Sequence, residues 1–316
     1  MRILLPGGFG FLGGRVALEL AAHAGWTVCL GSRQLRPAPD WLPEVETVQL
    51  DIFGPESLAR ALQGVEVVVH LAAMNERECV ADPARAIEVN ILGAHNLLQA
   101  AVAAGVRRFI YVSTAHIYGA PLAGQITEQT VPRPVHPYAV THRAAEDFVL
   151  AAHDQHKIEG VVVRLSNGFG RPVHPEADCW TLLVNDLCRQ AVTTGKLVLR
   201  SNGLQRRVFI PLPEAARGVA HLIALPSEQL GDGLFNLGGE SARSVWETTQ
   251  LIAARCQAVL GFTPAIERVS PLPGDKSLPL EYIVTKLQAT GFSLRARFED
   301  EVDATLSLCQ DVFGKS

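Results

Sequence analysis

A glycine-rich segment near the first residue constrains this chain more than any other feature. Gly7, Gly10 and Gly13 follow a short apolar run, Ile3–Pro6, and precede an amphipathic stretch over residues 14–24. Glycines at this spacing between a strand and a helix permit a tight turn. They also let the backbone approach a pyrophosphate, whose charge is met by free amides at the helix amino terminus. The segment therefore predicts a dinucleotide site at the start of an α/β sheet.

Short runs rich in Val, Ile and Leu alternate with helical stretches as far as residue 165. They lack polar alternation, which is typical of strands buried on both faces of a parallel sheet. We therefore expect an α/β fold with a doubly wound Rossmann sheet covered by helices on both sides. The predicted strands are Ile3–Pro6, Thr27–Gly31, Thr47–Leu50, Val65–Leu71, Phe109–Ser113 and Gly160–Leu165, and the predicted helices are Gly14–Ala24, Ala84–Ala104 and Tyr138–His153.

The pattern becomes less regular beyond residue 166, where prolines and long loops separate the helical stretches. We expect residues 1–165 to form an NAD(P)-binding Rossmann domain and residues 166–316 to form a smaller carboxy-terminal α/β substrate-binding lobe. The chain is expected to cross back to the first domain at least once. Within the lobe, Ser244 and Glu247 have the spacing of a capping box, which predicts a helix start.

Composition indicates a globular protein that acts on a small molecule. The chain is 48% hydrophobic with a formal net charge of -4 at pH 7, and its Lys and Arg residues are scattered, so neither nucleic acid nor an anionic membrane is indicated as a partner. No apolar run approaches the roughly 20 residues that span a bilayer, and we expect a cytoplasmic protein. The six cysteines lack the spacing of zinc ligands or of a disulfide framework, so reduced, mostly buried thiols and no metal are expected.

The end of the second predicted strand bears on the choice of cofactor. An NAD enzyme usually presents a carboxylate to the adenosine ribose there, whereas this chain has Gly31, Ser32 and Arg33. Ser32 and Arg33 can hold a 2′-phosphate by hydrogen bonding and charge, which favours NADP over NAD. The alternative is that Arg33 is simply exposed to solvent.

Further motifs continue along nearly the whole chain and carry a resemblance to a known family. They are Asp51-Ile52, His70-Leu71-Ala72-Ala73, Asn90-Ile-Leu-Gly93, Tyr111-Val-Ser113-Thr114, Pro137-Tyr138-Ala-Val-Thr-His142, Arg164-Leu-Ser-Asn167, Gly233-Leu-Phe-Asn236 and Thr285-Lys286. Together with the glycine segment, they resemble the extended short-chain dehydrogenase/reductase family. More specifically, the chain resembles its NAD(P)-dependent nucleotide-sugar epimerases and dehydratases.

This resemblance implies a role for each matching residue. Tyr138 and Thr114 match the catalytic tyrosine and its Ser/Thr partner, and His142 stands at the position of the family's catalytic lysine. Asn167 and Arg207 match residues that bind the nucleotide diphosphate of the substrate. The implied cofactor contacts are Gly7, Gly10, Phe11, Leu12, Gly13, Ser32, Arg33, Asp51, Ile52, Leu71, Ala72, Ala73, Asn90, Tyr138 and His142.

His142 is the largest departure from the family pattern. A phenol titrates near 10, so Tyr138 needs a nearby positive charge and a hydrogen-bond donor to take up a proton at neutral pH. Histidine four residues further on lies on the same helix face, but with an ordinary pKa near 6.5 it is mostly neutral at pH 7. Three outcomes stay open: a slower enzyme with an acid-shifted profile, an enzyme that uses another base, and a cofactor-binding protein that has lost catalysis.

Other departures bear on the reaction and the substrate. Family dehydratases carry an Asp-Glu pair after the residue matching Thr114, whereas this chain has Ala115-His116, which argues against dehydration. His116 is either a proton carrier or a hydrogen-bonded wall residue. Leu272 and Val208 replace an arginine and an aspartate that usually accompany Arg207. The charged loop Met74–Glu78 either contacts the sugar or is solvated.

These observations lead to one hypothesis and two alternatives. The hypothesis is a sugar-nucleotide epimerase of the 4-epimerase type that oxidises a hexose carbon and reduces it again, with the NADP or NAD cofactor kept bound. The first alternative is an NADP-dependent carbonyl or keto-sugar reductase, and the second is a dinucleotide-binding protein without catalysis. By resemblance to the family, a homodimer is expected.

Overall fold

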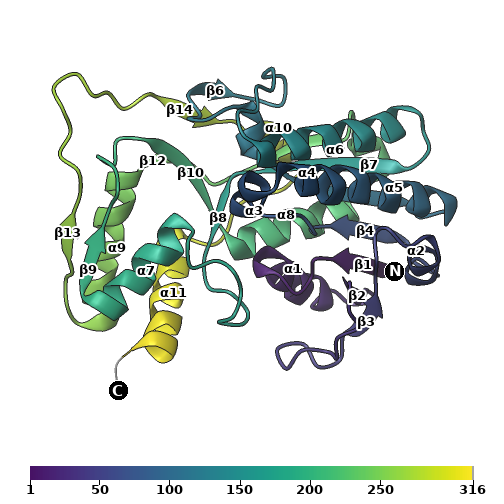
Figure 1. Ribbon diagram of the computed structural model, residues 1–316, viewed down its shortest axis with the longest axis horizontal. Coiled ribbons are helices and arrows are strands. Elements are labelled where there is room, and N and C mark those ends of the chain that lie inside the picture. The colour runs from purple at the N-terminus through teal and green to yellow at the C-terminus, as the bar shows by residue number, and fades with distance from the viewer. Residues whose placement is uncertain (315–316) are drawn as a thin grey trace.

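The main sheet of the computed structural model, which describes residues 1–314, contains seven parallel strands in the order β11-β7-β5-β4-β1-β2-β3 (Figure 1). Six of them confirm the strands predicted from sequence, each within two residues at either end. The fold is therefore the expected Rossmann-like α/β sheet. The strands are β1 (Arg2–Pro6), β2 (Thr27–Ser32), β3 (Glu46–Gln49), β4 (Val67–His70), β5 (Arg108–Thr114), β7 (Glu159–Leu165) and β11 (Leu234–Leu237).

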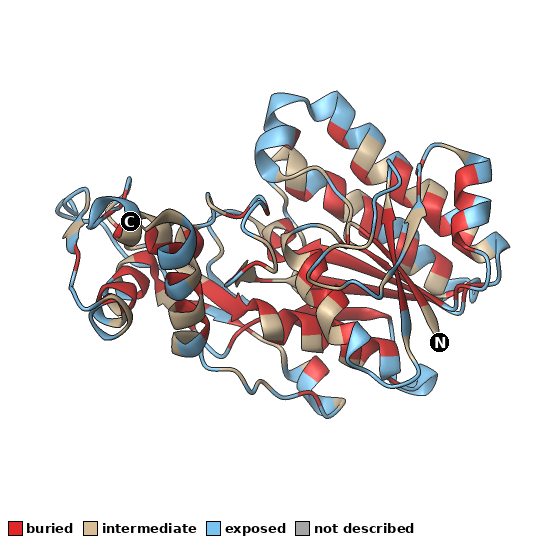
Figure 2. Ribbon diagram, turned by 90° about the horizontal axis from the view of Figure 1, so that it is seen from below, coloured by how far each residue is buried: buried red, intermediate tan, exposed pale blue. Residues whose placement is uncertain are grey.

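Helices cover both faces of this sheet and enclose two apolar clusters. On one face, α1 (Phe11–Ala21) and α8 (Leu212–Ala224) pack against the strands through residues such as Val16, Leu20 and Val219. On the other face, α2 (Pro55–Ala61), α5 (Ala94–Ala103) and α6 (Pro137–Asp154) contribute Leu58, Leu98 and other buried side chains. Apart from the edge strand β3, the strands between the two helical layers are mostly buried (Figure 2), which explains their lack of polar alternation.

The helix expected over Ala84–Ala104 is divided into three parts, and that prediction was too simple. It comprises α4 (Pro83–Ala86), a π-helical segment η1 (Ile87–Gly93) and α5. A short helix, α3 (Glu76–Ala81), begins within the charged Met74–Glu78 segment, for which the sequence predicts a loop. Asn75 and Glu78 form its capping box.

A buried ion pair fixes α6 against the sheet. The Arg164 guanidinium on β7 lies 2.8 Å from the Glu146 carboxylate on α6, and both side chains are almost completely buried. Arg164 also donates a hydrogen bond of 2.8 Å to the Tyr118 hydroxyl. Because a buried charge is tolerated only with partners, this network restricts where α6 and the side chains on it can lie.

A second, smaller lobe is seen at the left of Figure 1. Its core lies between α7 (Leu183–Thr194), α9 (Val245–Leu260) and α11 (Phe298–Phe313). The Ser244 capping box with Glu247 is confirmed at the start of α9. The other elements are η2 (Ala115–Tyr118), β6 (Gly124–Ile126), β8 (Asn167–Phe169), β9 (Lys196–Val198), β10 (Arg206–Pro211), η3 (Ser227–Gln229), β12 (Ala242–Ser244), β13 (Ala265–Glu267), β14 (Leu280–Tyr282) and α10 (Thr285–Ala289).

The chain crosses between its two parts more than once. After β8, α7 and β10, helix α8 packs on α1, and β11 joins the main sheet beside β7.

All six cysteines are buried and free, as expected from their spacing. Over residues 1–314, no helix has both the length and the apolar character that crossing a membrane requires.

Candidate functional site

The turn between β1 and α1 presses against the end of β4. Gly7 has a φ of +86°, a left-handed conformation that favours glycine. A Cβ atom at Gly7 would lie 2.7 Å from the amide nitrogen of Ala72, and one at Gly13 would lie 2.0 Å from the carbonyl oxygen of Gly7. Both positions therefore require glycine. The close contacts at these two positions are all between backbone atoms.

The first turn of α1 follows directly. Its N-cap is Gly10, and no side chain of the described residues caps the helix. The first amides of a helix have no intrahelical acceptor, so those of Phe11, Leu12 and Gly13 are free to donate to a ligand. Together with the helix dipole, they suit a pyrophosphate. The residues present thus fit the dinucleotide that the sequence predicts.

Two arginines lie near the end of β2, where the sequence predicts the adenosine ribose. Arg33 is exposed, whereas the Ser32 hydroxyl donates a hydrogen bond of 2.6 Å to the carbonyl oxygen of Gln34. Arg36, which the sequence analysis did not identify, lies with its guanidinium carbon 5.4 Å from the centre of the Phe9 ring in the glycine turn. This end of the turn therefore carries more positive charge than Ser32 and Arg33 alone had indicated.

Asp51 and Ile52 follow β3 and differ in exposure. Asp51 is exposed, and its carboxylate accepts a hydrogen bond of 3.0 Å from the backbone amide of Phe53. Ile52 is buried against the π-helical segment, where a Cβ at Gly93 would lie 2.2 Å from the Ile52 Cδ1 atom. The glycine in the Asn90–Gly93 motif is thus required by packing against Ile52.

Asn90 joins the end of β4 to helix α6. Residues 71–73 follow β4 and lie beside the glycine turn. The Asn90 side-chain oxygen accepts a hydrogen bond of 2.7 Å from the amide of Met74, the next residue in the chain. Its side-chain nitrogen donates to the Thr141 hydroxyl over 3.1 Å. Asn90 is almost completely buried within the π-helical segment. Local π geometry is frequent at functional sites, and here it turns one amide toward two separate elements.

Tyr138 and Thr114 meet where β5 ends and α6 begins. Tyr138 is the second residue of α6, and Thr114 is the last residue of β5. Burial raises the pKa of Tyr138 above its usual range, and nearby Cys79 and Glu76 raise it further. A hydrogen bond with the Thr114 side chain lowers this pKa, but it does not offset the other effects. Tyr138 therefore stays a neutral phenol at pH 7.

His142 lies beside Tyr138 but does not supply a positive charge. The centres of the two rings are 4.4 Å apart in an edge-on arrangement. Burial lowers the pKa of His142 to about 3, and the proximity of His70 and His116 contributes in the same direction. The Nδ1 atom of His142 is hydrogen-bonded to the Tyr111 hydroxyl at 2.9 Å. The sequence analysis did not single out Tyr111, because nothing in the local pattern links it to residue 142.

A second group of ionisable side chains lies next to Tyr138. The His136 ring is stacked 6.1 Å from the Tyr138 ring, and the His116 ring is 5.5 Å from His136. Burial lowers the pKa of His116; among the nearby charges, Glu76 raises it whereas His136 and Arg207 lower it. His116 is therefore a neutral imidazole at pH 7.

His136 also caps α6, a role that the sequence analysis did not identify. Its Nδ1 accepts a hydrogen bond of 3.3 Å from the amide of Ala139. The other ring nitrogen, Nε2, is buried without a partner among the described residues. Since Nδ1 accepts this hydrogen bond, the ring proton lies on Nε2, which offers a free donor on a ring stacked beside Tyr138.

The predicted substrate residues come together on β8 and β10, which are neighbouring parallel strands. The side-chain nitrogen of Asn167 donates a hydrogen bond of 3.0 Å to the carbonyl oxygen of Val208, next to Arg207. Burial lowers the pKa of Arg207, and nearby Glu76 raises it. Among residues 1–314, no carboxylate forms an ion pair with this guanidinium. Leu272, by contrast, is 70% exposed.

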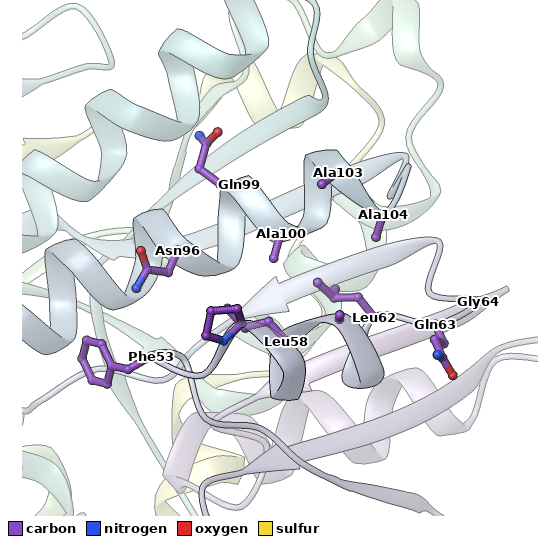
Figure 3. Close-up of a pocket in the computed structure, with 12 residues that line it drawn as sticks. Phe53, Leu58, Leu62, Gln63, Gly64, Asn96, Gln99, Ala100, Ala103 and Ala104 are labelled. Atoms are coloured by element: carbon purple, nitrogen blue, oxygen red, sulfur yellow. The ribbon is translucent and has the colours of Figure 1, made fainter.

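A hollow in the surface lies away from these residues. A cavity of about 640 Å³ opens between α2 and α5 (Figure 3). Its walls are mainly apolar, with Phe53, Leu58 and Leu62 on one side and Asn96 and Ala100 on the other. Over the described chain, none of the residues that line it is acidic, basic or a thiol. It therefore lacks the groups that the expected chemistry requires.

The buried histidines predict how stability depends on pH. Burial lowers the pKa of His70 to about 4 and that of His142 to about 3. Below pH 6.5 the unfolded chain takes up protons that the folded chain excludes, so stability is lost as pH falls. Each ring should lower the free energy of unfolding by about 2 kcal/mol between pH 7 and pH 5. Urea unfolding at both pH values should show a smaller drop for His142→Gln than for the wild type, whereas exposed His23→Gln should not change it. Equal drops in all three proteins would contradict the assignment.

Comparisons with known proteins agree with this geometry. The model of the NAD dependent epimerase/dehydratase family matches residues 3–238. The dTDP-D-glucose 4,6-dehydratase of Mus musculus is 29% identical over 258 residues, which cover 77% of this chain and 70% of the mouse protein. The UDP-glucose 4-epimerase of Thermus thermophilus, solved with NAD, is 25% identical with a TM-score of 0.81, and the match covers 99% of this chain and 100% of that one. The UDP-glucuronic acid 4-epimerase of Bacillus cereus, solved with its nucleotide sugar and NAD, is 22% identical with a TM-score of 0.82, again over 99% and 100%.

The family match extends over about three quarters of the chain and includes every motif from the glycine turn to Asn236. It confirms the resemblance inferred from those motifs, and the structural likeness confirms the fold. This chain belongs to the NAD dependent epimerase/dehydratase family.

Proposed function

We propose that this chain is a sugar-nucleotide epimerase that keeps a pyridine dinucleotide bound along the carboxyl edge of its main sheet. One observation carries the proposal: the glycine turn after β1 and the Tyr138–Thr114 pair after β5 lie at the same edge of a parallel sheet. Ligands of open α/β sheets bind at that edge. Residues 1–165 would then hold the cofactor and residues 166–316 the sugar nucleotide.

The cofactor site rests on the turn that only glycine can form. The free amides of Phe11, Leu12 and Gly13 would hold the pyrophosphate. The positive charge of Arg33 and Arg36 supports NADP, whereas the Thermus 4-epimerase was solved with NAD. When bound, the nicotinamide ring accepts a hydride from a carbon and returns it. The remaining steps concern this chain's own side chains.

The reacting centre would work through neutral hydrogen-bond donors. Tyr138 stays protonated, so its hydroxyl and that of Thr114 would hold the oxygen of the reacting sugar carbon. His142 is neutral as well and contributes no charge. Of the outcomes that the sequence left open, the geometry supports an enzyme that uses another base. His116 is suited to that role because its ring is neutral and lies next to His136, whose ring is stacked beside Tyr138.

The substrate proposal rests on β10 and on the relatives. Arg207 has a desolvated guanidinium without a carboxylate partner among the described residues, which suits a diphosphate. Asn167 holds the neighbouring carbonyl in place. The mouse relative is named for a dTDP-sugar and the Thermus structure for a UDP-sugar. A nucleotide sugar is therefore the proposed substrate, and the cytoplasm the proposed location.

A homodimer is the proposed assembly. Helix α6 and the neighbouring π-helical segment leave large apolar side chains in solvent: Ile87 is 54% exposed, Leu92 48%, Val140 47% and Phe148 45%. Contiguous exposed apolar surface on two packed helices suits pairing with the same surface on a second copy.

The glycine turn gives a direct test of cofactor binding. Gly13→Ala places a Cβ 2.0 Å from the Gly7 carbonyl oxygen, so the turn must open. We expect the dissociation constants for NAD and NADP to rise at least about tenfold, because the amides lose their alignment with the pyrophosphate. Gly54→Ala is the control, since its Cβ would meet no atom closer than 3.4 Å. Calorimetric titration with each dinucleotide measures the effect. Unchanged binding by Gly13→Ala would refute the proposed site.

The reaction is tested by incubating the purified protein with UDP-glucose or dTDP-glucose and either cofactor. An epimerase yields the epimeric sugar with no net change in cofactor absorbance, whereas a reductase consumes NADPH.

Tyr138→Phe should lower kcat in the same assay by about 100-fold or more. His116→Gln should lower kcat, and the remaining activity should lose the acid-side fall that protonation of the imidazole causes in the wild type. Exposed His23→Gln should retain the wild-type profile. Dinucleotide binding without any turnover would instead support the non-catalytic alternative.

The proposed dimer is tested by light scattering. The wild type should have twice the mass of one chain, because burying the apolar face of α6 and η1 favours association. Phe148→Glu should shift the protein toward the monomer by placing a charge in that face. Val198→Glu, an equally exposed apolar position in the smaller lobe, is the control. A wild type that remains monomeric at all concentrations would contradict the proposal.

A further inference from the structure

The contact between Tyr111 and His142 joins the centre of the sheet to the active helix. Tyr111 lies on β5, three residues before Thr114, and His142 lies on α6, four residues after Tyr138. The Tyr111 hydroxyl is 2.9 Å from the His142 Nδ1 atom, and each side chain is at most 3% exposed. The contact is therefore shielded from water.

Hydrogen-bond accounting determines which atom donates. If the Tyr111 hydroxyl donates to Nδ1, the proton of the neutral imidazole lies on Nε2, and one donor is left without a partner. If Nδ1 donates instead, two groups are left unsatisfied, the phenol proton and the Nε2 lone pair, because the Tyr111 hydroxyl has no other partner among residues 1–314. Each unsatisfied buried group costs about 1–3 kcal/mol, so the first arrangement is favoured.

The surrounding groups keep both side chains neutral. Burial raises the pKa of Tyr111 well above its usual value, and Glu146, Tyr138 and Cys79 raise it further. The Tyr111 oxygen therefore keeps its proton at neutral pH, and the imidazole it faces is uncharged at pH 7. A neutral imidazole whose Nδ1 accepts a hydrogen bond is a donor at Nε2 only.

The Nε2 atom of His142 is buried and has no partner among the described residues. The His142 ring that carries this atom lies beside the Tyr138 ring, where the proposed function places the nicotinamide end of the cofactor. A buried N–H without an acceptor is rare in folded proteins and is satisfied when a ligand supplies the acceptor. A ribose hydroxyl oxygen has the required chemistry.

We propose that Tyr111 is a positioning residue whose hydroxyl holds His142 in the Nε2–H tautomer, so that a neutral imidazole donates to a ribose hydroxyl of the bound dinucleotide. This inference rests on the proposed function for the identity of the ligand. The tautomer itself depends only on residues of this chain. The pair does not activate Tyr138 by charge, and its role is to orient the cofactor.

The tautomer is tested without any ligand. In protein labelled with nitrogen-15 histidine, the two ring nitrogens of His142 should show a protonated Nε2 and an unprotonated Nδ1 from pH 5 to pH 9. Tyr111→Phe keeps the ring and removes only the oxygen, and it should give a mixture of tautomers. A protonated Nδ1 in the wild type, or an unchanged spectrum in Tyr111→Phe, would overturn the proposal.

Binding tests the role toward the cofactor. Tyr111→Phe and His142→Phe should each raise the dissociation constant of NAD or NADP about fivefold, the equivalent of one hydrogen bond. The double variant should be no weaker than His142→Phe alone, because both changes remove the same donor. Tyr282→Phe, which removes another buried phenol that donates to the Arg164 carbonyl oxygen and the Asn236 side chain, should leave the constant unchanged.

Each outcome of the binding test has a distinct meaning. Additive effects of the two substitutions, or wild-type affinity in folded Tyr111→Phe, would overturn the positioning role while leaving the proposed function intact. A wild type that binds neither dinucleotide would refute the proposed function, and the nitrogen-15 spectrum would still decide the tautomer. Thermal unfolding of each variant shows that a weaker affinity does not come from a loss of folded protein.

Discussion

The close approach of backbone to backbone in the turn after β1 sets the geometry of the whole site. Gly13 packs against the carbonyl group of Gly7, and Gly7 packs against the backbone of Leu71 and Ala72. The position of the turn is therefore fixed relative to the end of β4. Because β1, β4 and β5 run in parallel, their carboxyl ends meet at one edge. Thr114 and Tyr138 are thereby positioned relative to the turn through the sheet itself.

Hydrogen bonds, rather than fixed charges, dominate the region around Tyr138. Buried His70 and His142 are neutral, and the phenols of Tyr111 and Tyr138 are held in their protonated forms by burial. Within a low-dielectric interior, oriented neutral donors are effective because water does not compete with them. The same environment makes a cationic side chain at position 142 expensive to desolvate. A histidine at that position is thus consistent with the groups around it.

The sequence predicted the sheet well because long runs of Val, Ile and Leu are buried from both sides and have few other interpretations. It predicted the glycine turn for an equally local reason. It did not predict the π-helical segment, because that segment is only seven residues long and lies inside a longer helical stretch. It also missed the pairing of Tyr111 with His142 and the capping role of His136. The first joins residues far apart in the chain, and the second uses a residue type that is seldom found at that position.

Strand β11 completes the main sheet although α7, β9, β10 and α8 separate it from β7 in the chain. During synthesis, β7 is therefore an open edge until β11 leaves the ribosome, and the apolar face of the sheet that α8 covers is exposed until that helix has been made. An unpaired edge with apolar neighbours is a template for association with another chain. A nascent chain that pauses between these two strands presents such an edge, and the sheet closes only once part of the smaller lobe has been made.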